Sequence, residues 1–105
     1  MTHITHATYY NEHILECSGH AGFAKKGHDI LCAAVSIICY TVAAYLKEAE
    51  AKGLISGFLC DISQGYANIR FSCKRGGEAE KCFFAIINGF KFLAESFPDH
   101  ILYEE

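Results

Sequence analysis

Cys32 stands where a thiol is readily ionised, three residues after Asp29 and close to the start of a long apolar run. Asp29 is a good helix N-cap, because its side chain can accept a hydrogen bond from the backbone N–H of Cys32. At the third helical position the sulfur faces unpaired N–H groups and the positive end of the helix dipole, which favour a thiolate over a thiol. Cys32 is therefore our candidate nucleophile.

A histidine is available to take the proton of this thiol. His20 lies twelve residues before the cysteine, and Gly19, Gly22 and Gly27 punctuate the segment around it. Glycine permits sharp reversals of the backbone, so the loop can fold the imidazole back against the sulfur. A Cys/His pair of this kind performs nucleophilic catalysis, with Asp29 or a backbone carbonyl orienting the ring.

Other residues of the same segment leave alternatives open. His28 stands one turn before Cys32 and is a rival base. A metal site can be drawn from Cys17, His20, His28 and Cys32, although the paired short spacings typical of zinc sites are absent. A small buried cysteine without any chemistry is the common interpretation of such an isolated motif.

The segment as a whole resembles the signature of a known family. It reads Gly-His-Ala, then a glycine, then Asp-Ile-Leu-Cys-Ala-Ala-Val-Ser over residues 19–36, which is similar to the signature of the ribosomal-processing cysteine proteases. The resemblance implies that His20 is the catalytic base and Cys32 the nucleophile. Beyond Ser36 no motif of comparable specificity is found.

The residues around this pair are assigned supporting roles. Asp29 caps the helix, and Ser36, one turn after Cys32, either hydrogen-bonds near the sulfur or is small enough to let a neighbour approach. We expect the backbone N–H of Cys32 and its helix-start neighbours to hold an oxyanion. We expect residues 21–28, with their glycines, to form a lid that substrate orders.

The resemblance also implies a reaction and partners. The reaction is endopeptidase cleavage after a hydrophobic aromatic segment, which removes the N-terminal extension of large-subunit ribosomal protein twenty-seven. The substrate is then a ribosomal-protein precursor, and the resemblance implies a homodimer. We expect no cofactor, no metal, no direct contact with nucleic acid and no membrane. A peptide-binding module without catalysis and a Cys/His metal-binding regulator are the alternatives.

Composition narrows the class of protein. The chain has 105 residues, of which 51% are hydrophobic, and a formal net charge of -3. This length predicts a single domain over residues 1–105, and the charge argues against a general nucleic-acid binder. The N-terminus lacks the features of a signal peptide, and the six cysteines lack the spacings of a disulfide framework. We therefore expect a cytoplasmic protein in which the five cysteines other than Cys32 are packing residues.

Periodicity predicts the elements that position the site. Residues 30–46 carry no charge, proline or glycine and predict a core helix, whose exposed end is marked by the charged residues between Lys47 and Lys52 and whose C-cap is Gly53. At about 1.5 Å per residue, the uncharged run is too short for a hydrocarbon layer of about 30 Å. A second helix is predicted over 78–97. Alternation and turn signals predict five strands, at 2–10, 14–18, 55–62, 66–73 and 101–103. The order ββαββαβ predicts an α+β two-layer sandwich of two helices against a largely antiparallel sheet.

Some histidines and aromatic residues lie outside these patterns. His3, His6 and His13 are interpreted as polar residues of the first hairpin. Phe84 and Phe92 lie off the apolar stripe of the second helix. Large apolar residues in such positions suggest a subunit interface or a peptide groove.

Overall fold

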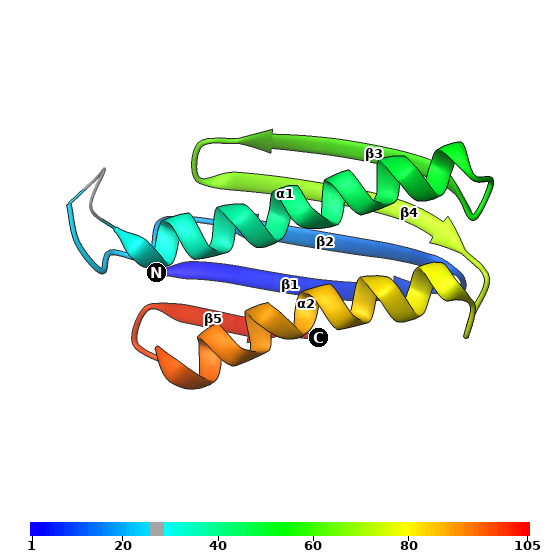
Figure 1. Ribbon diagram of the computed structural model, residues 1–105. Coiled ribbons are helices and arrows are strands. Elements are labelled where there is room, and N and C mark those ends of the chain that lie inside the picture. Colours follow the sequence, from blue (N-terminus) through cyan, green and yellow to red (C-terminus); the bar gives the residue numbers. More distant parts are fainter. Residues whose placement is uncertain (26–28) are drawn as a thin grey trace.

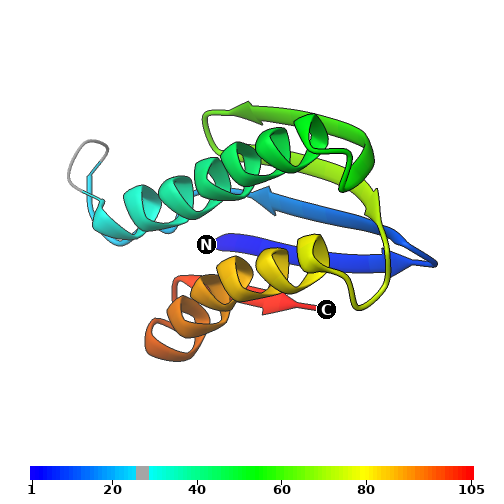
Figure 2. The ribbon, with the colours of Figure 1, turned by 45° about the vertical axis from the view of Figure 1, so that its right-hand side comes forward.

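A five-stranded sheet carries two helices on one of its faces (Figures 1 and 2). The computed structural model describes residues 1–25 and 29–105. The elements follow one another as β1 (Thr2–Tyr9), β2 (Glu12–Ser18), α1 (Ile30–Ala51), β3 (Ile55–Ser63), β4 (Tyr66–Cys73), α2 (Glu78–Ser96) and β5 (Ile101–Glu104). The predicted order ββαββαβ and the two-layer α+β class are therefore confirmed. Helix α1 ends at Ala51, just before the Gly53 that the sequence marks as its C-cap.

The strands lie in the order β3-β4-β2-β1-β5. All neighbouring pairs are antiparallel except β1 and β5, which run parallel, so the sheet is largely antiparallel as predicted. Ser18 at the end of β2 pairs with Tyr66 at the start of β4, and Tyr66 also pairs with Ser63 of β3. The end of β2 and the β3–β4 turn therefore lie together at one end of the sheet, where α1 also begins (Figure 1).

Helix α1 has a defined stop and one buried stripe. After Ala51, the N–H of Gly53 donates to the Glu50 carbonyl at 3.0 Å and that of Leu54 to the Ala49 carbonyl at 2.9 Å. These are the two bonds of a Schellman motif, and Gly53 supplies its left-handed residue with φ of 74°. The buried side chains of α1 recur at steps of three and four: Leu31, Val35, Cys39, Val42, Leu46 and Ala49.

Length and composition alone would allow α1 to cross a membrane, because an 18-residue window of it has a mean hydropathy of 1.9. In the fold the helix packs instead against the sheet and against α2, and its buried stripe joins the hydrophobic core. Helix α2 completes this layer with the buried aromatic side chains of Phe83 and Phe90. The prediction of a core helix is therefore confirmed.

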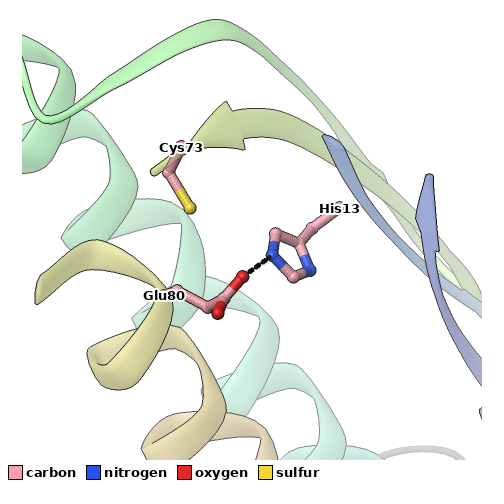
Figure 3. Close-up of side chains that lie close together, drawn as sticks. All are labelled: His13, Cys73 and Glu80. Atoms are coloured by element: carbon pink, nitrogen blue, oxygen red, sulfur yellow. Dashed lines mark hydrogen bonds and ion pairs between the residues drawn. The ribbon is translucent and has the colours of Figure 1, made fainter. Parts of the chain in front are cut away.

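A buried polar network lies between the first hairpin and α2. His6 and His13 belong to the hairpin as interpreted, but they are only 6% and 0% exposed. The Nε2 atom of His13 is 2.8 Å from Oε2 of Glu80 (Figure 3). The Nδ1 atom of His13 is 2.9 Å from Nε2 of His6. Glu80 also accepts a bond from the Gly76 amide and pairs with Nε of Arg75, each at 3.0 Å.

This network links stability to pH. Burial by itself would raise the pKa of Glu80, but bonds from the Gly76 amide and His13 and the charge of Arg75 lower that pKa below its ordinary value of 4.5. Burial, together with His13, lowers the pKa of His6 from its ordinary value of 6.5. Both groups therefore bind protons more readily in the unfolded chain. Their contribution to stability is complete at a pH above the ordinary pKa values. It is lost as the pH falls through the lowered pKa values of the folded protein.

Replacing Glu80 with alanine is expected to lower the free energy of unfolding by about 3 kcal/mol, because it leaves the buried His13 ring without its acceptor. Urea denaturation at pH 7 measures this loss. The matched control is Glu104→Ala, whose partner His3 lies at a similar distance of 2.7 Å but in an exposed pair, with side chains 45% and 56% accessible. This control should lose less than about 1 kcal/mol. Equal losses in the two variants would contradict a stabilising role for the buried pair.

Candidate active site

The carboxylate of Asp29 joins the start of α1 to the loop before it. Its Oδ1 accepts bonds from the N–H groups of Leu31 and Cys32, both at 3.0 Å. Its Oδ2 accepts bonds from Phe23 at 3.0 Å and Ala24 at 3.4 Å. Partial desolvation acts to raise the pKa of Asp29, but the bonds from these amides lower it overall. An ionised Asp29 therefore occupies the N-cap position that the sequence predicts.

Cys32 is partly buried at the third residue of α1, and its sulfur has one backbone partner. Sγ accepts a bond from the N–H of Ala21 at 3.4 Å. The N–H of Cys32 itself is bound to Asp29, so it is not free to hold an oxyanion. The expected use of that amide is therefore not supported. The amide that faces the sulfur belongs to Ala21.

His20 lies over the turn between β3 and β4. A Cβ atom added to Gly65 in that turn would come within 2.8 Å of the His20 Nε2 atom, so a larger residue would displace the ring from this position. Beside it, the N–H of Gly19 donates to the Gly65 carbonyl at 2.9 Å. Gly19 and Gly22 have φ angles of 89° and 69°, which side chains rarely allow. Glycines thus shape the backbone on both sides of His20.

His20 and Cys32 face a common cleft of about 730 Å³. One wall follows α1 from Cys32 through Ser36 to Tyr40, and the other is formed by the β3–β4 hairpin, including Ile62. Among the hydrogen bonds of residues 1–25 and 29–105, none joins the His20 ring or the Ser36 hydroxyl to the sulfur. The structure therefore brings the two predicted catalytic residues to one cleft without bonding them.

Part of the predicted loop lies outside the described residues. Gly27 and His28 both fall there, so the rival base and the third loop glycine are not placed by the structure. The proposed lid over residues 21–28 is described only as far as residue 25.

The described cysteines differ in their surroundings. Cys17 and Cys39 are buried beneath the cleft, with their sulfurs 3.6 Å apart, and they pack as predicted. Cys60 is exposed on β3, so the prediction that all cysteines other than Cys32 are packing residues is wrong for this one. An edge strand exposes its outer side chains, and alternation alone did not identify which face of β3 is covered.

Potential metal ligands gather away from the residues of the alternative metal site. Within the described part of the chain, one group of three offers ligand atoms within 4.8 Å of one another: His13, Cys73 and Glu80 (Figure 3). Burial raises the pKa of the Cys73 thiol, which keeps its proton in place. The Glu80 carboxylate is already held by Arg75 and by the Gly76 amide. The group is therefore satisfied as an ion-pair network, and Cys17, His20 and Cys32 form no second group of this kind among the described residues.

Two site residues carry no signal in the sequence. The Nδ1 atom of His100 lies 2.9 Å from the Ala21 carbonyl oxygen, and Gly65 supports the His20 ring. His100 follows the end of α2, and Gly65 reads only as a hairpin turn. Nothing in their spacing connects either residue to the segment around Cys32, because both contacts arise from tertiary packing.

The sequence matches a protein-family model described as cysteine protease Prp over residues 1–102. The chain belongs to the Prp family of cysteine proteases. It is therefore a hydrolase, and the resemblance drawn from residues 19–36 is confirmed. The chain is 29% identical over 99 residues to the ribosomal processing cysteine protease Prp of Mycoplasma pneumoniae, which covers 90% of this chain and 89% of that protein. It is 28% identical over 99 residues to the Prp of Mycoplasma genitalium, covering 90% of each.

Two solved structures share this fold. One is the essential ribosomal processing protease Prp from S. aureus, in complex with a covalently linked product peptide, at 22% identity and a TM-score of 0.70 over the full length of both chains. The other is SMU.848 from Streptococcus mutans, at 23% identity and a TM-score of 0.67, covering 99% of this chain and 92% of that one. These likenesses establish the Prp fold for the chain.

Substitutions at Asp29 are expected to separate its two functions. Asp29→Asn keeps one oxygen for the amides of Leu31 and Cys32 but turns an NH₂ group toward those of Phe23 and Ala24. We expect amide hydrogen exchange at residues 23 and 24 to become at least about tenfold faster in Asp29→Asn, with little change at 31 and 32. Asp29→Ala should accelerate exchange at all four positions. Unchanged exchange at 23 and 24 in both variants would contradict the anchoring role.

Proposed function

We propose that the chain is an endopeptidase in which Cys32 is the nucleophile and His20 the general base. Its substrate is the precursor of large-subunit ribosomal protein twenty-seven, from which it removes the N-terminal extension after a hydrophobic aromatic segment. One observation carries this proposal: Cys32, in the first turn of α1, and His20 line the same cleft. Family membership and the ribosomal-processing names of the relatives support the substrate.

The chemistry follows from the groups in the cleft. His20 removes the proton of the Cys32 thiol, and the sulfur attacks the carbonyl carbon of the scissile peptide bond. The C–N bond then breaks, and the imidazolium of His20 gives its proton to the departing amine. A water molecule, deprotonated by His20, hydrolyses the thioester and restores the thiol. The ring and the sulfur are not bonded in the free protein, so we propose that substrate draws them together, as catalytic contacts often tighten only in the complex.

The cleft suits an apolar peptide segment. Its walls include Tyr40 and Val35 on α1 and Ile62 on the facing hairpin. Pockets that bind organic ligands are lined in this way by apolar and aromatic side chains with a few polar groups for orientation. This lining supports cleavage beside a hydrophobic aromatic segment.

The decisive measurement is cleavage of a peptide that carries the ribosomal extension and the first residues after it. Cys32→Ala is expected to lose all detectable cleavage, because the other two cysteines that line the cleft, Cys17 and Cys39, are buried. His20→Ala should lower kcat/KM about 10²- to 10⁴-fold, as loss of a general base does. Mass spectrometry of the products locates the cleaved bond.

Two controls accompany this assay. Cys60→Ala removes an exposed cysteine outside the cleft and should retain full cleavage. His28→Ala tests the rival base and should also retain cleavage. Activity that survives Cys32→Ala would falsify the protease proposal, and tight peptide binding without cleavage by the unmodified protein would favour a binding module instead.

The proposal includes a cytoplasmic homodimer. Phe84 and Phe92 are large apolar residues of α2 that stay partly open to solvent, with 37% and 66% of their surface exposed. A second copy would remove this apolar surface from water. We expect sedimentation to give about twice the chain mass of 11.6 kDa.

Phe92→Glu should shift this protein to the monomer, since it places a charge in the proposed interface. The matched control is Leu59→Glu, at an equally exposed apolar residue on β3, 66% accessible, which should remain dimeric. A monomeric unmodified protein, or a dimer unaffected by Phe92→Glu, would count against this interface.

A further inference from the structure

Ala21 is held on both sides by side chains from distant parts of the chain. Its N–H donates to Sγ of Cys32 at 3.4 Å, and its carbonyl oxygen lies 2.9 Å from Nδ1 of His100. Ala21 is itself buried in the core. The two bonds fix the peptide planes before and after this residue, and so fix the direction in which its N–H points.

His100 is a firm support because its own position is determined by the fold. Its N–H donates to the Phe97 carbonyl at 3.0 Å, and its carbonyl accepts from the N–H of Thr2 at 2.9 Å. The ring of Phe23 meets it edge-on, with ring centres 5.4 Å apart. His100 thus connects the loop before α1 to the end of α2 and to β1.

The other amides near the sulfur already have partners. Those of Leu31 and Cys32 donate to the Asp29 side chain, and that of Ala33 donates to the Asp29 carbonyl at 3.2 Å. In the described part of the chain, the Ala21 N–H is therefore the backbone donor directed at the reacting atom.

The Ala21 N–H is placed to stabilise the negative charge at two successive stages of the proposed reaction. Before attack, this charge lies on the sulfur, to which the Ala21 N–H donates a hydrogen bond. As the S–C bond forms, the charge moves to the substrate oxygen next to the sulfur. A fixed donor beside both atoms stabilises the charge in each position without having to reorient.

We propose that His100 is a positioning residue that aims the Ala21 N–H at the Cys32 thiolate and then at the oxyanion. The inference rests on the proposed role of Cys32 as nucleophile. The Nδ1–H group can donate to the Ala21 carbonyl in the Nδ1-protonated neutral ring and in the charged ring alike. His100 therefore needs no change of charge to perform this role.

The test compares His100→Ala with His100→Asn in a Cys60→Ala background. Asn is the conservative variant, because its side-chain NH₂ can donate from nearly the same place as the imidazole Nδ1–H. We expect His100→Ala to lower kcat for the extension peptide at least about tenfold, with KM changed less than about twofold. His100→Asn should recover most of this loss. His3→Ala, at an exposed histidine that does not line the cleft, should behave as the unmodified protein.

A second readout does not depend on peptide cleavage. Iodoacetamide alkylation of Cys32, followed by mass spectrometry across pH, reports how readily the thiolate forms. The midpoint should move to higher pH in His100→Ala and return in His100→Asn, because the Ala21 amide no longer stabilises the anion in the first variant. This readout also separates the two proposals, since it responds to His100 even if the extension peptide is not the substrate.

The outcomes are distinct. A lower kcat with a raised alkylation midpoint, both recovered by asparagine, supports the positioning role. A lower melting temperature with an unchanged alkylation profile would show that His100 is only structural and would overturn the inference. An unchanged kcat and midpoint in His100→Ala would overturn it as well.

Discussion

One carboxylate determines the geometry of the active site. Asp29 accepts four backbone N–H groups, two from the first turn of α1 and two from the loop before it. Hydrogen bonds to an ionised acceptor are stronger than those between neutral groups. The loop and the helix start are therefore held together as one unit, and this unit includes Cys32. The same carboxylate accepts hydrogen bonds from the amides at the helix start, so the amide that donates to the sulfur is a different one, that of Ala21.

A second constraint acts at the other end of the sheet. The His13–Glu80 pair joins β2 to α2 in a site from which water is excluded, and Arg75 completes the charge balance. Because β2 ends at Ser18, immediately before Gly19 and His20, the position of this strand sets where the histidine emerges. The network is remote from the cleft, yet it holds the strand from which the proposed catalytic segment begins.

The elements were predictable because each has a local cause. Apolar residues repeat along α1 and α2 with helical spacing, and β4 alternates between buried and less buried side chains. The end of α1 was predictable for an equally local reason. The charged residues from Lys47 onward mark the exposed side of the last turns, whose other side still buries Ala49, and Gly53 follows as the helix stop. The parallel pairing of β1 with β5 joins the two ends of the chain, and no neighbouring residues encode it.

The sequence by itself determined the cap of Asp29, the place of Cys32 in the first helical turn and the glycines around His20, because these features depend on residues a few positions apart. Only the tertiary structure decided that the Ala21 amide faces the sulfur, that His100 supports it from 79 residues away, and that Gly65 makes room for the His20 ring. Hydrogen-bond and packing partners so far apart in the chain meet only when the sheet and both helices have assembled. Local rules therefore identify the proposed reacting groups, whereas packing decides which backbone N–H lies beside the Cys32 sulfur.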